Sequence, residues 1–212
     1  MKKIPWLFQK TIKIPEEWDD PIPLNKYCTF TDGDWILEKH YSKNGVRLLQ
    51  IADIGLGNFR DKSKKFISVQ TSNDLNCKII EQGKDILISR MPDPVGKACI
   101  APILPYSYIV SVDIAILKIN ESEIDRKFLV HYLNSSNFLN YVIKYVAGST
   151  RERISRKNLE NIKIFLPPLK EQKKIGSILT NMDQLIQAQQ QIIEQTQKLM
   201  KGQMEKLLTS GL

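Results

Sequence analysis

Two adjacent prolines, Pro167 and Pro168, separate the last part of this chain from everything before it. Proline cannot sit inside a helix, but it fits the first turn, where no intrahelical N–H is needed. After this pair the chain has no further proline and only three glycines, Gly176, Gly202 and Gly211. We therefore predict a helix that begins beside the second proline and runs almost to the last residue. A helix of about 40 residues would be about 60 Å long, far longer than the folded body of a chain this size.

Aliphatic pairs recur every seven residues along this helix. We call them the seam; they are Ile178, Leu179, Leu185, Ile186, Ile192, Ile193, Leu199 and Met200. A seven-residue apolar repeat predicts a narrow contact with another helix, as in a coiled coil. The polar residues Gln189, Thr196 and Gln203 beside the seam can fix the register of such a pair. The alternative is a helix that folds back on its own domain, since a core-facing helix is the usual case.

The preceding part of the chain predicts a mixed α/β domain, which we place at residues 1–166, with the helix at 167–212. Hydrophobic residues make up 42% of the 212 residues, enough for a packed core. Strands are expected at 47–51, 66–69, 85–90, 97–103, 108–119 and 162–166, where apolar runs alternate with turn residues. Helices are expected at 125–134, across 138–146 and at 155–161, with Asp125 and Ser155 as N-caps.

The charge of the chain favours a polyanion partner. The net charge is +8, and residues 1–165 carry 25 of the Lys and Arg but only 19 of the Asp and Glu. A basic protein of this kind suits nucleic acid, although a generic basic surface is the plain alternative. Two clusters stand out, and each lies near a predicted loop: Arg60, Lys62, Lys64 and Lys65 in the first, and Arg151, Arg153, Arg156 and Lys157 in the second. Cations on such loops are suited to contacts with phosphates and base edges of nucleic acid. The alternative is a solvated basic surface, which is what most runs of charged residues form.

Signatures of catalysis are mostly absent from the sequence. There is no phosphate-binding glycine loop and no nucleophile elbow. The two histidines, His40 and His131, lack metal-ligand spacing, so we predict no metal site. A loose nuclease-like pattern, Pro92-Asp93 followed by Asp125-Arg-Lys127, is better explained by chance.

The location that the sequence predicts is the cytoplasm. Three widely spaced cysteines form neither a disulfide framework nor a zinc pattern, which favours a reducing compartment. No run is apolar enough to span a membrane, and the basic N-terminus lacks the apolar stretch of a secretory signal.

An ordered set of short motifs resembles the specificity subunit of type I restriction–modification systems over about residues 15–212. The motifs, in chain order, are Gly33-Asp-Trp35, Leu48-Leu-Gln-Ile-Ala-Asp-Ile54, Gly83-Lys-Asp-Ile-Leu-Ile-Ser-Arg90, Val112-Asp-Ile-Ala-Ile-Leu-Lys118, Tyr132-Leu-Asn-Ser-Ser136, Gly148-Ser-Thr-Arg-Glu-Arg-Ile-Ser155 and Leu166-Pro-Pro-Leu-Lys-Glu-Gln172. The last of these leads into the long helix.

The resemblance implies a target recognition domain that reads one half of a split sequence in double-stranded DNA. It implies that the helix spaces this domain from a second one and docks the modification (methyltransferase) subunit and, where present, a restriction subunit. The usual chain of that family has two recognition domains and two antiparallel helices, so one of each resembles a half-length form. Such a form would act as a homodimer or pair with another half subunit.

The resemblance further implies that the chain is not an enzyme and has no cofactor of its own. S-adenosylmethionine would bind the partner methyltransferase, and no Asn/Asp-Pro-Pro-Tyr/Phe motif is present here. Our candidate DNA-binding residues are Arg60, Lys62, Lys64, Lys65, Arg151 and Arg153. The competing hypothesis is a nuclease or nucleic-acid-modifying enzyme with a helical dimerisation tail.

Overall fold

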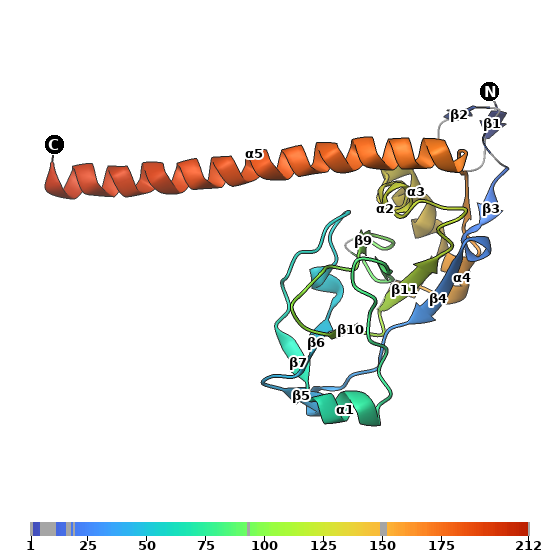
Figure 1. Cartoon of the computed structure of the whole chain (residues 1–212), viewed down its shortest axis with the longest axis horizontal. Helices are drawn as coiled ribbons and strands as arrows, with labels where there is room; N and C mark the ends of the chain where they lie inside the picture. Colours follow the sequence, from blue (N-terminus) through green and yellow to red (C-terminus); the bar gives the residue numbers. More distant parts are fainter. Residues whose placement is uncertain are drawn as a thin grey trace.

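A computed structural model of the chain describes residues 2–4, 12–15, 18, 20–92, 94–148 and 152–211. It contains a body of short strands and helices and one long helix, α5, which runs Leu169–Ser210 and extends far past the body (Figure 1). This arrangement confirms the predicted mixed α/β domain followed by a long C-terminal helix. Among the described residues, no helix combines the length and the apolar character that a membrane crossing requires.

Two four-stranded sheets form the centre of the body. The first is antiparallel throughout, in the order β4 (Cys28–Asp32), β11 (Ile114–Ile119), β8 (Ile86–Ser89) and β9 (Ala98–Ile100). The second has the order β10 (Tyr108–Val110), β6 (Val46–Leu49), β7 (Lys65–Ile67) and β5 (Tyr41–Ser42), and its β10–β6 pair is parallel.

The other elements are short and connect or flank the two sheets. The helices of the body are α1 (Val69–Asp74), α2 (Arg126–Leu133), α3 (Ser136–Val142) and α4 (Arg156–Glu160). Three two-stranded pairs are β1 (Lys2–Ile4) with β2 (Ile12–Ile14), β3 (Ile22–Pro23) with β14 (Lys163–Ile164), and β12 (Val146–Ala147) with β13 (Arg153–Ile154). The 3-10 turns are η1 (Leu24–Lys26), η2 (Glu38–His40), η3 (Ile51–Asp53) and η4 (Ile143–Tyr145).

The first sheet is buried on both faces. Ile86 and Ile88 of β8 belong to a core that includes residues of α2, α3 and α4, whereas Leu87 between them belongs to a core shared with the second sheet. Successive side chains of a strand point to opposite faces, so one strand serves both cores. Burial on both faces explains why these strands are nearly continuous apolar runs in the sequence.

Some predicted element boundaries are wrong. The expected strand at 108–119 is two strands, because the N–H of Ile114 donates to the carbonyl of Ser111 (2.9 Å) and closes a turn that sends β10 and β11 into different sheets. The expected strand at 97–103 ends at Ile100, shortly before Pro102, which has no N–H to donate. The second predicted helix ends at Val142, because Val146 pairs with β13 as part of β12.

Two predicted helix caps are confirmed. The carboxylate of Asp125 accepts a hydrogen bond from the N–H of Phe128 (2.9 Å) at the start of α2. The hydroxyl of Ser155 accepts one from the N–H of Asn158 (3.0 Å) at the start of α4. Each side chain satisfies a donor that has no intrahelical partner, which is why these residue types mark helix starts.

The amide side chain of Gln172 joins the first turn of α5 to the domain. Pro168 is the cap residue, and Gln172, four residues later, is 1% exposed. Its oxygen accepts the N–H of Asp125 (2.8 Å), while its nitrogen donates to the carbonyls of Glu123 (3.1 Å) and Pro167 (2.9 Å). Because Asp125 is also the N-cap of α2, this one side chain sets where both helices begin.

The next turns of α5 pack closely on α2. A Cβ built on Gly176 would lie 2.6 Å from the backbone nitrogen of Phe128, so the two helices approach too closely for a side chain there. Further along, the Nε2 of His131 lies 3.1 Å from the hydroxyl of Thr180. Burial lowers the pKa of His131, and the nearby carboxylate of Asp183 offsets this only in part. His131 therefore has a structural role, because its side chain joins α2 to α5.

Beyond these turns the helix extends away from the body (Figure 1). Every seam residue is exposed, from 37% for Leu179 to 66% for Leu185 and Ile186. The alternative of a helix folded back along its own domain is therefore wrong. At 42 residues the helix is about 63 Å long, close to the predicted length.

Two glycines of the same helix should respond oppositely to alanine. Gly176→Ala should lower the free energy of unfolding by about 1–3 kcal/mol, because the added methyl group must push α5 away from α2. Gly202→Ala is the matched control: nothing lies within 4 Å of its Cβ position, so the change should stabilise the helix by up to about 1 kcal/mol. Chemical denaturation followed by circular dichroism measures both. Equal effects of the two changes would contradict the close helix contact.

Candidate nucleic-acid interface

The first predicted cation cluster lies on the segment that follows η3 and ends at the first residue of β7, and we call residues 54–65 the basic loop. The segment is folded around the carboxylate of Asp53, which is fully buried. This carboxylate accepts hydrogen bonds from the backbone N–H groups of Gln50, Lys62 and Ser63, each at 2.7 Å, and from the hydroxyl of Ser63. Four donors converge on one carboxylate, so the chain is fixed at both ends of the loop.

Arg47 of β6 is a second buried charge, 1% exposed, and it is hydrogen-bonded to the basic loop. Its guanidinium donates to the carbonyl of Ser63 (2.6 Å), the hydroxyl of Tyr106 (2.6 Å) and the carboxylate of Asp61. The same group lies over the rings of Phe59 and Tyr106, 5.7 and 5.8 Å from their centroids. Burial opposes the charge, but the hydrogen bonds to Asp61 and Tyr106 outweigh it and raise the pKa of Arg47.

The four cations predicted on this loop are all exposed: Arg60, Lys62, Lys64 and Lys65. Lys64 pairs with the carboxylate of Asp61 (2.8 Å), and hydrogen bonds from Lys64 and Arg47 lower the pKa of that carboxyl group. The ammonium of Lys65 lies over the ring of Tyr41, 4.4 Å from its centroid. A fixed backbone therefore presents four cations to solvent at one edge of the domain.

The second predicted cluster has a different setting. Arg151 lies outside the described residues. Arg153, in β13, is partly buried: its Nε lies 3.5 Å from a carboxylate oxygen of Asp113, and its Nη2 donates to the carbonyl of Val112 (3.2 Å). Arg153 is thus held by the domain rather than displayed on an open loop. Among the described residues, no hydrogen bond or ion pair joins this cluster to the basic loop.

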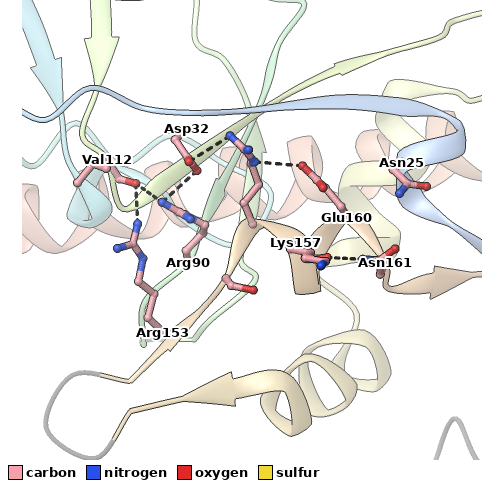
Figure 2. A pocket seen from close by; sticks show the side chains of 10 residues that line it. Asn25, Asp32, Arg90, Val112, Arg153, Lys157, Glu160 and Asn161 are labelled. Atoms are coloured by element: carbon pink, nitrogen blue, oxygen red, sulfur yellow. Dashed lines mark hydrogen bonds and ion pairs between the residues drawn. The ribbon is translucent and has the colours of Figure 1, made fainter.

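Arg153 lines a hollow of about 720 Å³, which we call the arginine hollow (Figure 2). Its walls come from the ends of β4 and β8, the turn before β11, and the segment from β13 through α4. Arg90, which follows β8, is its most buried charged residue, with an Nη2 that lies 3.1 Å from Asp32 and donates to the carbonyl of Val112. Arg156 of α4 lies 3.2 Å from the other oxygen of Asp32.

The electrostatics of the hollow are dominated by its guanidinium groups. Burial lowers the pKa of Arg90; Asp32 raises it in part, and the positive charge of Arg153 lowers it again. In the described part of the chain, no group of three or more His, Cys, Asp or Glu residues is arranged to hold a metal ion. The guanidinium and ammonium groups of both clusters are suited to binding negative charge.

Several residues that organise these surfaces were missed from the sequence, namely Arg47, Asp53, Arg90 and Asp32. A signal was present for most of them, because Arg47, Asp53 and Arg90 are charged residues inside or at the end of apolar strand segments. Charged residues are almost never fully buried unless they are paired, so such positions indicate a buried ion pair or hydrogen-bond network. The identity of the partners is set by the fold and could not be read from spacing.

Comparison with known proteins shows which family the chain matches. The family model for the type I restriction modification DNA specificity domain matches residues 15–198. The chain is 28% identical over 202 residues to the type I restriction enzyme MjaVIII specificity subunit of Methanocaldococcus jannaschii, a match that covers 94% of this chain and 47% of the relative. It is 33% identical to the putative MjaX specificity subunit of the same organism, covering 94% of this chain and 44% of that one. The chain thus spans about half the length of these curated relatives.

Solved structures show the same fold. One is a chain from a structural study of complex assembly and conformational transition in the type I R-M system. It matches this chain with a TM-score of 0.65 at 24% identity, and the match covers 95% of this chain and 48% of the other. The HsdS subunit from Thermoanaerobacter tengcongensis matches with a TM-score of 0.60 at 22% identity, covering 95% and 47%. The likeness extends over the body and the long helix together, because almost the whole chain is covered.

The rigidity of the basic loop should depend on the buried carboxylate of Asp53. Asp53→Ala removes the acceptor of the Lys62 and Ser63 N–H groups, and each buried donor left without an acceptor costs about 1–3 kcal/mol. We expect a lower free energy of unfolding and faster hydrogen exchange at the amides of Lys62 and Ser63. Asp74→Ala, which removes an exposed carboxylate from α1, is the control and should change neither. Unchanged exchange at these two amides would show that the loop is held by other contacts.

Proposed function

We propose, from the premise that this chain belongs to the type I restriction–modification DNA specificity family, that its domain reads a half-site of a bipartite DNA sequence and that its helix joins it to the other subunits. The observation that carries the DNA half of the proposal is the basic loop. Its backbone is fixed by Asp53 and Arg47, and its cations face solvent. A surface that keeps its shape before binding loses little entropy when it binds.

The cations on the loop are suited to two kinds of contact. Lysines such as Lys62 and Lys64 are compact charges that neutralise phosphates without reading sequence. Arg60 carries a planar guanidinium that can also bind guanine through two hydrogen bonds. We infer that the loop combines phosphate contacts with base contacts, which is how a domain positions itself on DNA and then selects a sequence.

The observation that carries the assembly half is the exposed seam of α5. Eight large apolar side chains lie on one stripe of a helix that the body leaves uncovered. Apolar patches of this kind on a folded protein mark a surface for another chain. We infer that a second helix covers the seam, from a second copy or another half subunit, and that the modification subunit docks beside it. A restriction subunit would join through these partners.

In this proposal the chain itself is not catalytic. Methyl transfer would belong to the modification subunit, with S-adenosylmethionine bound there. The competing nuclease hypothesis required Asp93 and Asp125 to act together. Asp93 lies outside the described residues, and the carboxylate of Asp125 already accepts a hydrogen bond as the N-cap of α2. This position supports a structural role for Asp125 and so favours the specificity subunit over the enzyme.

Removing two loop cations should weaken binding to all DNA sequences alike. For Lys62→Ala with Lys64→Ala, measured in the assembled complex, the removal of each phosphate contact should reduce the slope of log K against log salt by about one unit. The control is Lys163→Ala with Lys170→Ala, which removes the same charge from exposed positions on β14 and α5. Titration of labelled DNA at several salt concentrations measures both. If the loop variant and the control keep the same slope as the wild type, the loop is not the DNA face.

Charges placed in the seam should prevent assembly. Ile186→Lys with Ile193→Lys would bury ammonium groups in an apolar helix contact, which costs several kcal/mol unless they are paired. The control is Gln191→Lys with Gln195→Lys, which adds the same charge on the opposite face of the helix. Light scattering of each variant, alone and with the modification subunit, should show loss of association for the seam variant only. An unchanged mass of the seam variant in both settings would contradict the seam as an interface.

A further inference from the structure

The arginine hollow contains more positive charge than its own ion pairs neutralise. Its lining carries four cationic side chains, Arg90, Arg153, Arg156 and Lys157, and the two carboxylates of Asp32 and Glu160. A third carboxylate, that of Asp113, lies 3.5 Å from the Nε of Arg153. The remaining lining is neutral and includes the side chains of asparagine and serine residues. Like charges held this close repel each other, and Arg153 contributes to the lowered pKa of Arg90. Four cations against three carboxylates leave the cluster with an excess of one positive charge.

The hollow also contains hydrogen-bond donors that the described protein does not use. Arg90 is 4% exposed, yet its Nε–H has no hydrogen-bond acceptor among the described residues. The Nε–H of Arg153 is likewise buried without a hydrogen bond, although Asp113 lies 3.5 Å away. A buried donor without an acceptor is destabilising, so a ligand that supplies an acceptor would be bound favourably. Excess charge and unused donors call for the same kind of ligand, an oxyanion.

The two carboxylates do not block such a ligand. One oxygen of Asp32 lies 3.1 Å from Arg90 and the other lies 3.2 Å from Arg156, while Glu160 lies 3.1 Å from the Nε of Arg156. Figure 2 shows these carboxylates in contact with guanidinium groups, with Lys157 and Arg153 on other sides of the opening. Their charge is therefore neutralised locally, and Arg153 in turn faces Asp113. For a ligand there remain the ammonium of Lys157 and the unused Nε–H groups of Arg90 and Arg153.

We propose that the arginine hollow binds a phosphate group, and that in the assembled protein this phosphate belongs to the DNA backbone. The identity of the phosphate, but not the existence of the site, rests on the function proposed above. Guanidinium groups pair with phosphate through two parallel hydrogen bonds, which gives both affinity and a fixed direction. A backbone phosphate held here, away from the basic loop, would give the domain a second point of contact and so fix its register on the duplex.

The first test uses inorganic phosphate and the whole chain. Titration at constant ionic strength, with chloride as the replaced anion, should shift the Nε–H resonance of Arg90 in NMR spectra. Arg153→Gln with Lys157→Gln should weaken this response at least tenfold, whereas Lys163→Gln, an exposed lysine on β14, should leave it unchanged. No phosphate-specific shift of Arg90 in the wild type would overturn the site. Equal responses in the hollow variant and the control would do the same.

The second test asks where the phosphate comes from. In the assembled complex, Arg153→Gln with Lys157→Gln should reduce the salt slope of DNA binding by about one unit for each phosphate contact that these changes remove. A variant that no longer responds to inorganic phosphate but binds DNA with an unchanged slope would overturn the DNA assignment and favour a free phosphate compound. If the wild-type complex bound no DNA at all, the proposed function would fail, while the phosphate titration would still decide the hollow.

Discussion

The placement of the long helix depends on the buried amide of Gln172. Its three hydrogen bonds tie the first turn of α5 to the start of α2 and to the chain before the helix. Gly176 then lets the two helices approach closely, and His131 meets Thr180 one turn later. Asp183 still lies 3.8 Å from His131, and beyond the turns around Gln187 the helix extends away from the body (Figure 1). A short polar and close-packed joint therefore sets the direction of a helix about 63 Å long.

Buried charge organises the basic loop and the arginine hollow in a similar way. Asp53 and Arg47 are almost fully buried, and each is surrounded by partners of complementary hydrogen-bonding character. A buried carboxylate is costly unless it is paired, but once satisfied by several donors it specifies one loop conformation. Arg90 differs in its position, because it lines the arginine hollow, whereas the guanidinium of Arg47 is enclosed by the basic loop and Tyr106. That difference is what distinguishes a structural charge from one that can receive a ligand.

The body and the long helix contribute different surfaces to the molecule. The first sheet, covered on one face by helices and on the other by the second sheet, is a rigid base with the polar surfaces at its ends and edges. The helix adds length and an apolar stripe that the body does not cover. Loops on such a base can vary without disturbing the core. Under the proposed function, changes in these loops would alter DNA recognition and leave the seam unchanged.

The sequence by itself determined the long helix, its seam, the caps at Asp125 and Ser155, and the mixed α/β class, because these follow from local patterns of proline, polar caps and apolar period. The basic loop was also predictable, since its cations are neighbours in the chain. Only the tertiary structure decided that Gln172 joins α5 to α2, that residues 108–119 divide between two sheets, and that Arg90 meets Asp32, Arg153 and Arg156 in one hollow. These contacts join residues as many as 124 positions apart, and local patterns carry no information about which distant partners packing brings together.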